Sequence, residues 1–429
     1  MAQTLKFGNG TWATKKGSTL AYNDEDGNFK PLPFTATRST SATRVNKEGL
    51  IEVVSNEVPR IDYTDSEDGV FLLEKAATNL VTYSEDFSQW DMSNTSYSPN
   101  QTISPDGTLN SAKIIPNTNN VKHYTYFQGA AMNNNQSWSI FVKAENYSNI
   151  SITSGSISNG FEVKFDLSLG TVHSVQGAAY ESSKIESIGN GWYRCSVISS
   201  RTSGSWLQIY VLDDSHNSIF QGDGTSGIYL WGGQTVNSSV TTSYIPTYGS
   251  SATRSAETAS GSGNSEVFNS EQGVLFANIA ANADDGNSRR ITINDGSTSN
   301  RIIIEYSSIS NRLSVYFVIS SSNQVSFQYN MSDVTVYSKI AFKYKLNDFS
   351  LYVNGIKVLT DTVGNVFTQG TLNVIDLDNS NGNNPFYGKT KELAYYNEIL
   401  TDLELETLTS YRTWEEMVKE LNLNIIHNE

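Results

Sequence analysis

Aromatic rings and amides alternate along two stretches of this sequence in a pattern that could bind sugars. Where such a stretch is a β-strand, every second side chain lies on the same face. Flat rings pack against the apolar face of a sugar, and amides hydrogen-bond to its hydroxyls. The candidate glycan-binding residues are Tyr124, Tyr126 and Gln128 in one stretch, and Trp206, Gln208 and Tyr210 in the other. The competing interpretation is that these rings belong to the core of a sandwich.

Acidic residues could supply general acid–base chemistry or bind calcium, but their spacing favours neither. They gather at turn-like places: Asp65, Glu67 and Asp68; Asp284 and Asp285; Asp376 and Asp378; and the Asp of Gly222–Gly224. Carboxylates in such loops usually form solvated turns, and calcium ligands are the alternative. Acid–base chemistry in retaining glycosidases needs two carboxyl groups about 5 Å apart. Because the spacing favours neither such a pair nor a calcium site, the sequence predicts no cofactor, with calcium as the only alternative.

Other catalytic arrangements find little support. The four histidines, at positions 123, 173, 216 and 427, are dispersed without metal-ligand spacing. No Gly-x-Ser-x-Gly elbow, phosphate loop or dinucleotide fingerprint occurs. Cys195 is the single cysteine, which excludes an intramolecular disulfide and a cysteine-based zinc site. We therefore expect a protein that is not an enzyme.

Composition favours strands and excludes several classes of protein. Of the 429 residues 17% are charged, while Tyr, Phe and Trp are frequent and recur at strand spacing. The net charge of −15, without a basic cluster, argues against nucleic-acid binding. No stretch approaches 18 consecutive apolar residues, and the N-terminus lacks the apolar core of a secretory signal, so we expect no membrane insertion.

Strand and turn patterns predict an all-β chain of tandem antiparallel sandwiches. The predicted parts are a small N-terminal β module at residues 1–70, a sandwich at 71–249, a linker at 250–271, a second sandwich at 272–400 and a helical tail at 401–429. The linker is inferred from its Ser, Gly and Thr content, and limited proteolysis is expected to cut there first. In the tail, Thr401 with Glu404 and Thr413 with Glu416 are capping-box signals, so one helix or two are expected.

Three blocks of sequence resemble bacteriophage virion proteins. They are PRIDYTDSEDGVFLLEKAATNLVTYSEDFSQWD (Pro59 to Asp91), FTATRSTSATRVNKEGLIEVV upstream of it, and GDGTSGIYLWGGQ with SSVTTSYIPTYGSSATRSAET downstream. In such proteins the first block leads into a jelly roll and the third closes it. The resemblance implies a head or tail fibre or appendage subunit, with residues 1–70 joining it to the virion or to other subunits.

A second resemblance concerns residues 272–400. FSLYVNGIKV (Phe349 to Val358), followed by GKTKELAYYNEILTDLELETL (Gly388 to Leu408), is similar to concanavalin-like lectin and laminin-G domains. The glycosidases of that fold carry a Glu-x-Asp-x-x-Glu signature on one strand, which this sequence lacks.

These observations predict a phage structural protein that attaches the virion to bacterial surface glycans. The expected partners are other virion proteins and a surface glycan, and the expected location is the virion, assembled in the host cytoplasm. Short N-terminal strands cannot hide their edges alone, which favours subunits that share strands. The resemblance to phage fibres implies that the assembly is a homotrimer. Two alternatives stay open: a polysaccharide depolymerase, and an architectural decoration protein without a ligand.

Overall fold

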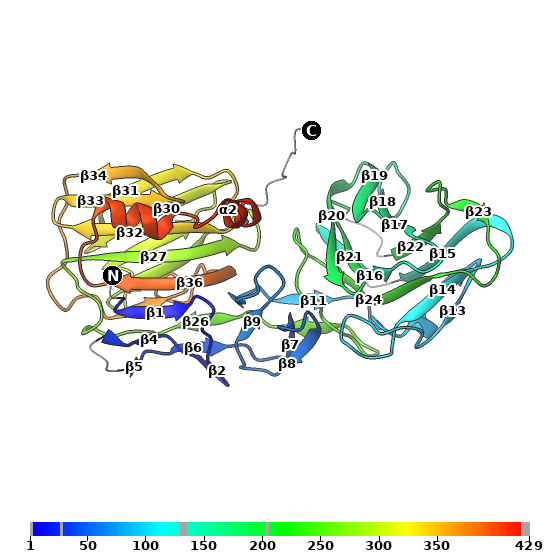
Figure 1. Cartoon of the computed structure of the whole chain (residues 1–429), viewed down its shortest axis with the longest axis horizontal. Helices are drawn as coiled ribbons and strands as arrows, with labels where there is room; N and C mark the ends of the chain where they lie inside the picture. Colours follow the sequence, from blue (N-terminus) through cyan, green and yellow to red (C-terminus); the bar gives the residue numbers. More distant parts are fainter. Residues whose placement is uncertain (1–2, 26–28, 129–134, 202–205, 422–429) are drawn as a thin grey trace. The chain divides into compact units, whose positions relative to one another are not determined.

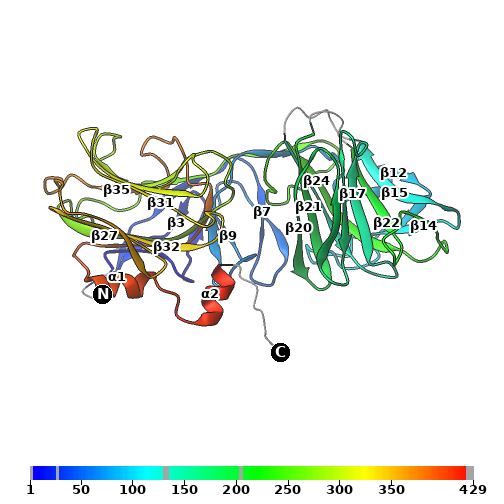
Figure 2. The same cartoon turned by 90° about the horizontal axis from the view of Figure 1, so that it is seen from above.

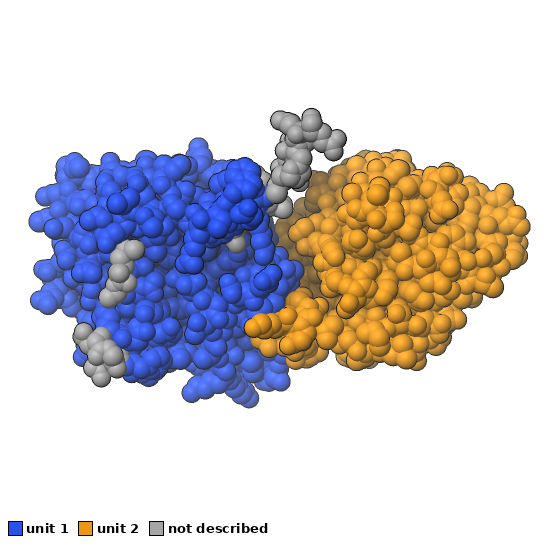
Figure 3. All heavy atoms as spheres, in the orientation of Figure 1, with its two compact units in different colours: residues 1–39, 54–75, 256–429 blue, residues 40–53, 76–255 orange. Residues whose placement is uncertain are grey.

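The computed structural model describes residues 3–25, 29–128, 135–201 and 206–421 (Figure 1). Almost all regular structure in it is antiparallel β, with two short α-helices towards the C-terminal end, which confirms the predicted all-β class. The chain forms two compact units (Figure 3). Unit 1 comprises residues 1–39, 54–75 and 256–429, and unit 2 comprises residues 40–53 and 76–255.

Unit 2 is a sandwich of two antiparallel sheets, which Figure 2 shows as two layers. One sheet has seven strands: β12 (Asp91–Ser93), β15 (Asn120–Gln128), β22 (Trp206–Leu212), β17 (Asn149–Ser154), β18 (Phe161–Asp166) and β19 (Thr171–Gln176) in this order, with β23 (Ile219–Gln221) paired to β15. The other has six: β13 (Thr95–Ser98), β14 (Ala112–Pro116), β24 (Ile228–Val236), β16 (Gln136–Lys143), β21 (Trp192–Ser199) and β20 (Tyr180–Gly189).

The core of unit 2 follows from the alternation of apolar residues along these strands. Trp138, Ile140 and Val142 of β16 point inward, as do Ile150 and Ile152 of β17, and all are fully buried in one cluster. Two short pairs complete the unit: β7 (Ala42–Val45) with β8 (Ile51–Val54), and β11 (Ala77–Asn79) with β25 (Ala252–Arg254). A single turn of 3₁₀-helix covers Phe87–Gln89.

Unit 1 contains the second sandwich. Its larger sheet runs β34 (Ile356–Asp361), β33 (Asp348–Val353), β32 (Ser338–Lys345), β27 (Gln272–Ala281), β36 (Gly388–Tyr396), β1 (Leu5–Gly8), β4 (Tyr22–Asn23) and β5 (Lys30–Pro31), with β10 (Val70–Leu72) and β9 (Arg60–Asp62) joined at β36. The smaller sheet is β31 (Ser322–Asn330), β30 (Arg312–Ile319), β29 (Arg301–Tyr306), β28 (Arg289–Asn294) and β35 (Val374–Asp376). A third sheet joins β2 (Thr14–Lys15), β3 (Ser18–Thr19), β6 (Phe34–Thr37) and β26 (Thr258–Ser260).

The predicted N-terminal module does not form a compact unit of its own. β1 pairs antiparallel with β36, so that Leu5 lies opposite Tyr395 and Phe7 opposite Leu393. Phe7 and Phe34 are buried in the same apolar cluster as the second sandwich. Residues 1–39 and 54–75 therefore belong to unit 1, and residues 40–53 to unit 2. Strands this short bury too little area to be stable alone, and here the larger sheets supply the missing surface.

The predicted linker at residues 250–271 is also replaced by ordered structure. It contains β25, which pairs with β11, and β26, which pairs with β6. Arg254 and Glu257 are 1% and 3% exposed, and Val267 and Phe268 belong to the core of unit 1. The Ser- and Thr-rich composition reflects short strands with one solvated side rather than a flexible tether.

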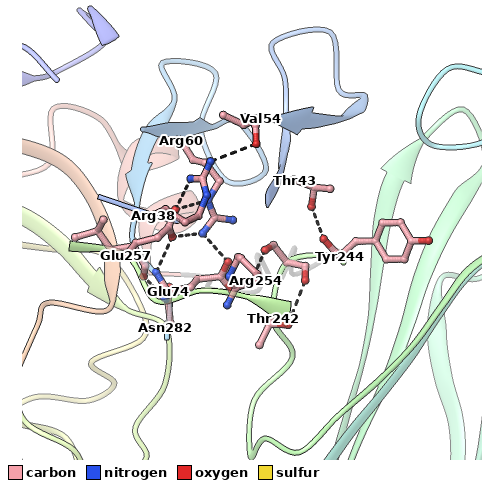
Figure 4. Close-up of polar contacts among 12 residues, drawn as sticks. Arg38, Thr43, Val54, Arg60, Glu74, Thr242, Tyr244, Arg254, Glu257 and Asn282 are labelled. Atoms are coloured by element: carbon pink, nitrogen blue, oxygen red, sulfur yellow. Dashed lines mark hydrogen bonds and ion pairs between the residues drawn. The ribbon is translucent and has the colours of Figure 1, made fainter. Parts of the chain in front are cut away.

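Glu257 is the centre of a buried charged cluster in unit 1, shown in Figure 4. Its Oε1 accepts hydrogen bonds from Arg38 Nη1 and Arg60 Nε, both at 2.8 Å, and its Oε2 is paired with Arg60 Nη2. The backbone N–H of Glu74 donates to Oε2 at 3.0 Å, and the Glu74 carboxylate lies 2.8 Å from Arg60 Nη2. Burial opposes the charge of Arg60, but Glu257 and Glu74 outweigh it and raise its pKa. Arg60 is in β9, and Arg38, Glu74 and Glu257 lie within two residues of the ends of β6, β10 and β26, so these four charges connect the four strands.

The C-terminal tail forms two helices, α1 (Asp402–Thr409) and α2 (Trp414–Glu420). Thr401 and Glu404 form the predicted capping box, and the Thr413 side chain accepts a hydrogen bond from the Glu416 backbone N–H. Leu405 of α1 packs with Val274, Phe276 and other residues of the larger sheet. The last eight residues of the predicted tail, 422–429, lie outside the described residues. Within those that are described, no helix combines the length and apolar character needed to cross a membrane.

Candidate functional site

The six predicted sugar-binding residues lie on one face of the seven-stranded sheet of unit 2. β15 and β22 pair antiparallel, and directly opposed residues of such a pair share a face. The register places Tyr124 opposite Tyr210, Tyr126 opposite Gln208, and Gln128 opposite Trp206. The structure therefore brings together all six side chains, which come from segments some 80 residues apart.

This face lies outside the core. The alternate residues His123, Thr125, Leu207, Ile209 and Val211 are all buried, and the apolar ones among them belong to the core cluster. Tyr124, Tyr126, Gln208 and Tyr210 are half-buried, Gln128 is exposed, and Trp206 is 40% exposed. The rings are therefore on the outer face of the sheet.

Four of these rings form a continuous row, which we call the aromatic array: Tyr210, Tyr124, Tyr126 and Trp206. Tyr210 stacks on Tyr124 with centroids 4.6 Å apart, and Trp206 stacks on Tyr126 at 5.3 Å with an interplanar angle of 12°. Tyr124 and Tyr126 link the two pairs at 5.9 Å. Cross-strand aromatic pairs of this kind contribute roughly 0.5–1.5 kcal/mol beyond their buried area. Because each ring restrains its neighbours, the array is organised before any ligand arrives.

The polar groups of the array are largely available to a ligand. Among the described residues, none forms a hydrogen bond with the side chain of Tyr124, Tyr210, Gln128, Gln208 or Trp206. Burial raises the pKa of Tyr210 to about 12, so its hydroxyl is protonated and neutral at physiological pH. Burial, followed by the nearby Asp91 carboxylate, also raises the pKa of Tyr126. The face offers phenol, indole and amide groups beside flat apolar rings.

Polar residues of neighbouring strands extend this face on both sides. Asp91 of β12 lies opposite Tyr126, and Ser151 of β17 lies opposite Tyr210. Beyond Ser151 the register reaches Lys164 of β18, and the neighbouring row, through Thr153 of β17, reaches Glu162 of β18. One outer face thus contains the array together with charges of both signs.

Two histidines that are distant in sequence also meet near this sheet. The rings of His173 and His216 stack with centroids 3.6 Å apart, and Lys164 donates to the backbone carbonyl of His216. His123 is buried, with its two ring nitrogens 2.8 and 2.9 Å from backbone carbonyls of Asn94 and Phe220. His427 lies outside the described residues. The spacing of the histidines along the sequence gave no signal of the His173–His216 stack.

Most acidic residues at predicted turns have protein partners. Asp65 pairs with Lys389, and Asp223 accepts hydrogen bonds from the backbone N–H groups of Thr225 and Ser226. Burial alone would raise the pKa of Asp285, but hydrogen bonds from Lys75 and Arg289 outweigh it and lower that pKa to about 2. Across the described residues, no group of three or more His, Cys, Asp or Glu side chains could hold a metal ion.

Asp376 and Asp378 differ from the predicted solvated turn residues. Both are buried, and Asp376 is the last residue of β35. The Asp376 carboxylate accepts hydrogen bonds from the backbone N–H of Gly261 and from the Asn294 amide, at 2.7 and 2.8 Å. Burial, and then the charge of Asp376, raises the pKa of Asp378. These carboxylates are hydrogen-bonded parts of the interior of unit 1.

Residues 275–406 match a family model described as the concanavalin A-like lectin/glucanases superfamily. The match begins in β27 and ends in α1, so this part of the chain has the predicted concanavalin-like domain. A search of curated proteins finds no match to the sequence.

Solved structures with a partial likeness include three from different organisms. The CBM40 of a Ruminococcus gnavus IT-sialidase has 17% identity and a TM-score of 0.29, covering 33% of this chain and 84% of that one. Domain 4 of the Geobacillus stearothermophilus arabinanase AbnA has 14% identity and a TM-score of 0.31, covering 41% and 84%. Domains LG4-5 of the mouse laminin alpha1 chain have 10% identity and a TM-score of 0.24, covering 65% and 86%. These TM-scores are too low to support a conclusion about this chain.

Proposed function

We propose that this protein binds a bacterial surface glycan without cleaving it, as a structural appendage of a bacteriophage virion. The observation that carries the proposal is the aromatic array on the outer face of unit 2. The phenols of Tyr124 and Tyr210, the Trp206 indole and the adjacent amides of Gln128 and Gln208 have no hydrogen-bond partner among the described residues. Rings on the outer face of the sheet do not pack in the core of the sandwich. A sugar has an apolar face that can stack on these rings and hydroxyls that can bond to the polar groups beside them.

The second unit supports the same function through its family match. Residues 275–406 resemble a superfamily whose description includes lectins, which are carbohydrate-binding proteins. Two sandwiches of this kind in one chain fit a protein that displays binding surfaces. The virion role is supported by the three sequence blocks in Pro59–Asp91, Phe34–Val54 and Gly222–Thr258. The short edge strands β2 and β5 support an assembly in which subunits share strands, and the resemblance to phage fibres favours a homotrimer.

The placement of carboxylates on the outer face favours binding over hydrolysis. Asp91 and Glu162 are in the same cross-strand row, but four strand spacings separate them. At about 4.8 Å a spacing, this is about 19 Å. Glycosidase pairs lie about 5 Å apart, or roughly 6.5–9.5 Å apart in inverting enzymes. These two groups cannot act as such a pair, so the depolymerase alternative finds no support at this face.

A weak single site is sufficient for attachment. A ring over a sugar contributes about 1 kcal/mol beyond its buried area, so one array would bind in the range from millimolar to high micromolar. Many copies on one particle raise the effective concentration of the remaining sites once the first is bound. Firm attachment then results from copy number rather than from the strength of one site.

The test is to display the protein on beads and measure the capture of host cells. Trp206→Ala and Tyr126→Ala are expected to reduce capture, because each removes one partner of a stacked pair. Tyr248→Ala is the matched control, because Tyr248 is a 78% exposed tyrosine of unit 2 outside the array. Circular dichroism confirms that each variant is folded.

Two results would contradict the proposal. If both array variants fold and capture cells as well as the parent protein, the rings serve only to stabilise the sheet, and the architectural alternative is favoured. If incubation with the captured cells' polysaccharide releases reducing ends, the protein is a depolymerase.

A further inference from the structure

The aromatic array has a positive charge at one end. Lys122 precedes Tyr124 by two residues on β15, so both side chains point to the outer face. Its Nζ lies 5.8 Å from the centroid of the Tyr210 ring, within the range of a cation–π contact. Lys122 is exposed, and no ion pair joins it to a carboxylate among the residues that are described. The ring therefore holds this ammonium group in place without neutralising it.

Carboxylates lie on the same face as the array. Asp91 of β12 lies opposite Tyr126, and its carboxylate contributes to the raised pKa of that tyrosine. The Glu162 carboxylate contributes in the same way to the raised pKa of Tyr210. Lys122 is the cation in contact with a ring of the array, so an acidic group of a ligand would be placed at Lys122.

A second lysine lies on the same side of the sheet. The cross-strand row that contains Tyr210 continues through Ser151 to Lys164. The Lys164 ammonium donates to the His216 carbonyl at 2.9 Å and likewise has no carboxylate partner among the described side chains. Two lysines without a paired carboxylate thus lie on this outer face, Lys122 over the Tyr210 ring and Lys164 two strands beyond it, in a chain whose net charge is −15.

We infer that the array binds an acidic glycan, with the anionic group held by Lys122 beside Tyr210 and the neutral part of the chain over Tyr126 and Trp206. This inference rests on the proposed glycan binding and adds the class of ligand. An acidic polymer is repelled by the chain as a whole, so a local cation is needed where it docks. A lysine forms shorter and stronger hydrogen bonds to an anionic oxygen than to a neutral hydroxyl. The anionic group is a carboxylate of an acidic sugar or a phosphodiester.

The test uses surface polysaccharide extracted from the captured cells and immobilised in three forms: untreated, with its carboxyl groups reduced to alcohols, and with its phosphodiesters cleaved by hydrofluoric acid. The parent protein is expected to bind the untreated form best and to lose affinity for one treated form, which identifies the anionic group. Lys122→Met is expected to weaken binding to the untreated form about two- to fivefold, the range for one exposed ion pair. It should leave binding to the form without the anionic group unchanged.

Two further variants isolate the charge. Lys122→Arg keeps the charge and should retain most of the affinity. Lys184→Met removes a lysine of unit 2 from β20 of the other sheet and should change nothing. Added salt should weaken binding of the parent protein to the untreated form and have little effect on Lys122→Met.

The outcomes separate this inference from the proposed function. If every form of the polysaccharide binds equally, or if Lys122→Met weakens all forms alike, the glycan is neutral at this site and the inference is refuted while glycan binding stands. If no form binds to the parent protein, the proposed function fails and the inference fails with it.

Discussion

Replacing Glu257 by glutamine is expected to destabilise unit 1 by about 3 kcal/mol. The substitution keeps the shape of the side chain but removes the negative charge that faces Arg38 and Arg60. Glu257 is 3% exposed, and both guanidinium groups are equally buried, so water cannot replace the lost partner. The amide nitrogen of glutamine would also face guanidinium N–H groups, which are donors themselves.

The magnitude follows from what remains in the cluster. Removing one partner of a buried ion pair costs roughly 3–5 kcal/mol, because it leaves an uncompensated buried charge. Here Glu74 still pairs with Arg60 at 2.8 Å, so the net excess is one positive charge rather than two. We therefore expect the lower end of the range.

The assay is urea unfolding combined with hydrogen exchange measured by mass spectrometry. Exchange should accelerate in β6, β9 and β26, which the cluster joins, and should stay unchanged in the strands of unit 2. Glu266→Gln is the matched control, because Glu266 is an exposed glutamate of the same unit. Its substitution should change stability by less than about 0.5 kcal/mol. A loss below about 1 kcal/mol for Glu257→Gln, with the control unchanged, would refute the assignment of this cluster as a structural centre of unit 1.

Three further predictions follow from the fold. Trypsin should cut at the exposed Lys16 before the buried Arg254, and early cleavage at Arg254 would show that residues 250–271 are a flexible linker after all. Gly355→Ala should destabilise the protein more than Gly370→Ala in thermal unfolding. Both glycines have positive φ, 85° and 77°, but a Cβ at 355 would lie 2.6 Å from Ser410 Oγ, while a Cβ at 370 meets nothing within 4 Å. Equal losses of stability would mean that backbone strain alone, and not the contact with Ser410, decides the effect. The pKa of Asp285 is lowered to about 2 in the folded state, so its contribution to folding stability is present above pH 3.8 and is lost as the pH falls towards 2. Asp285→Asn should therefore make stability depend less steeply on pH between 3.8 and 2. An unchanged acid-unfolding curve would contradict the low pKa.

Local signals in the sequence predicted local structure well. The strand and turn patterns predicted an all-β chain, and Thr401 and Thr413 cap α1 and α2, as their capping-box signals indicate. Asn354 and Gly355, in the block FSLYVNGIKV, both have positive φ, as a type I′ hairpin turn requires. Alternation, turn residues and capping boxes act over a few residues, so their physical causes are contained in the sequence window that shows them.

Long-range pairing left no such signal. The β1–β36 pair places Leu5 opposite Tyr395, and the Arg60–Glu257 ion pair joins β9 to the residue that precedes β26, a strand of another sheet. In each pair, the residues around one partner carry no sequence pattern that identifies the other partner. The same applies to residues 250–271, whose small polar side chains suit a tether and a half-buried short strand equally well. This is why the predicted domain boundaries differ from the two interleaved units.

The candidate site shows the same division. The sequence by itself determined that Tyr124, Tyr126 and Gln128 share one face of a strand, and that Trp206, Gln208 and Tyr210 share one face of another, because the side-chain period of a strand is two residues. Only the tertiary structure decided that these strands are neighbours, that their register brings the two sets together, and that this face is turned away from the core. Alternation specifies which residues lie together on a face, but which of the two faces is covered depends on the sheet that packs against it.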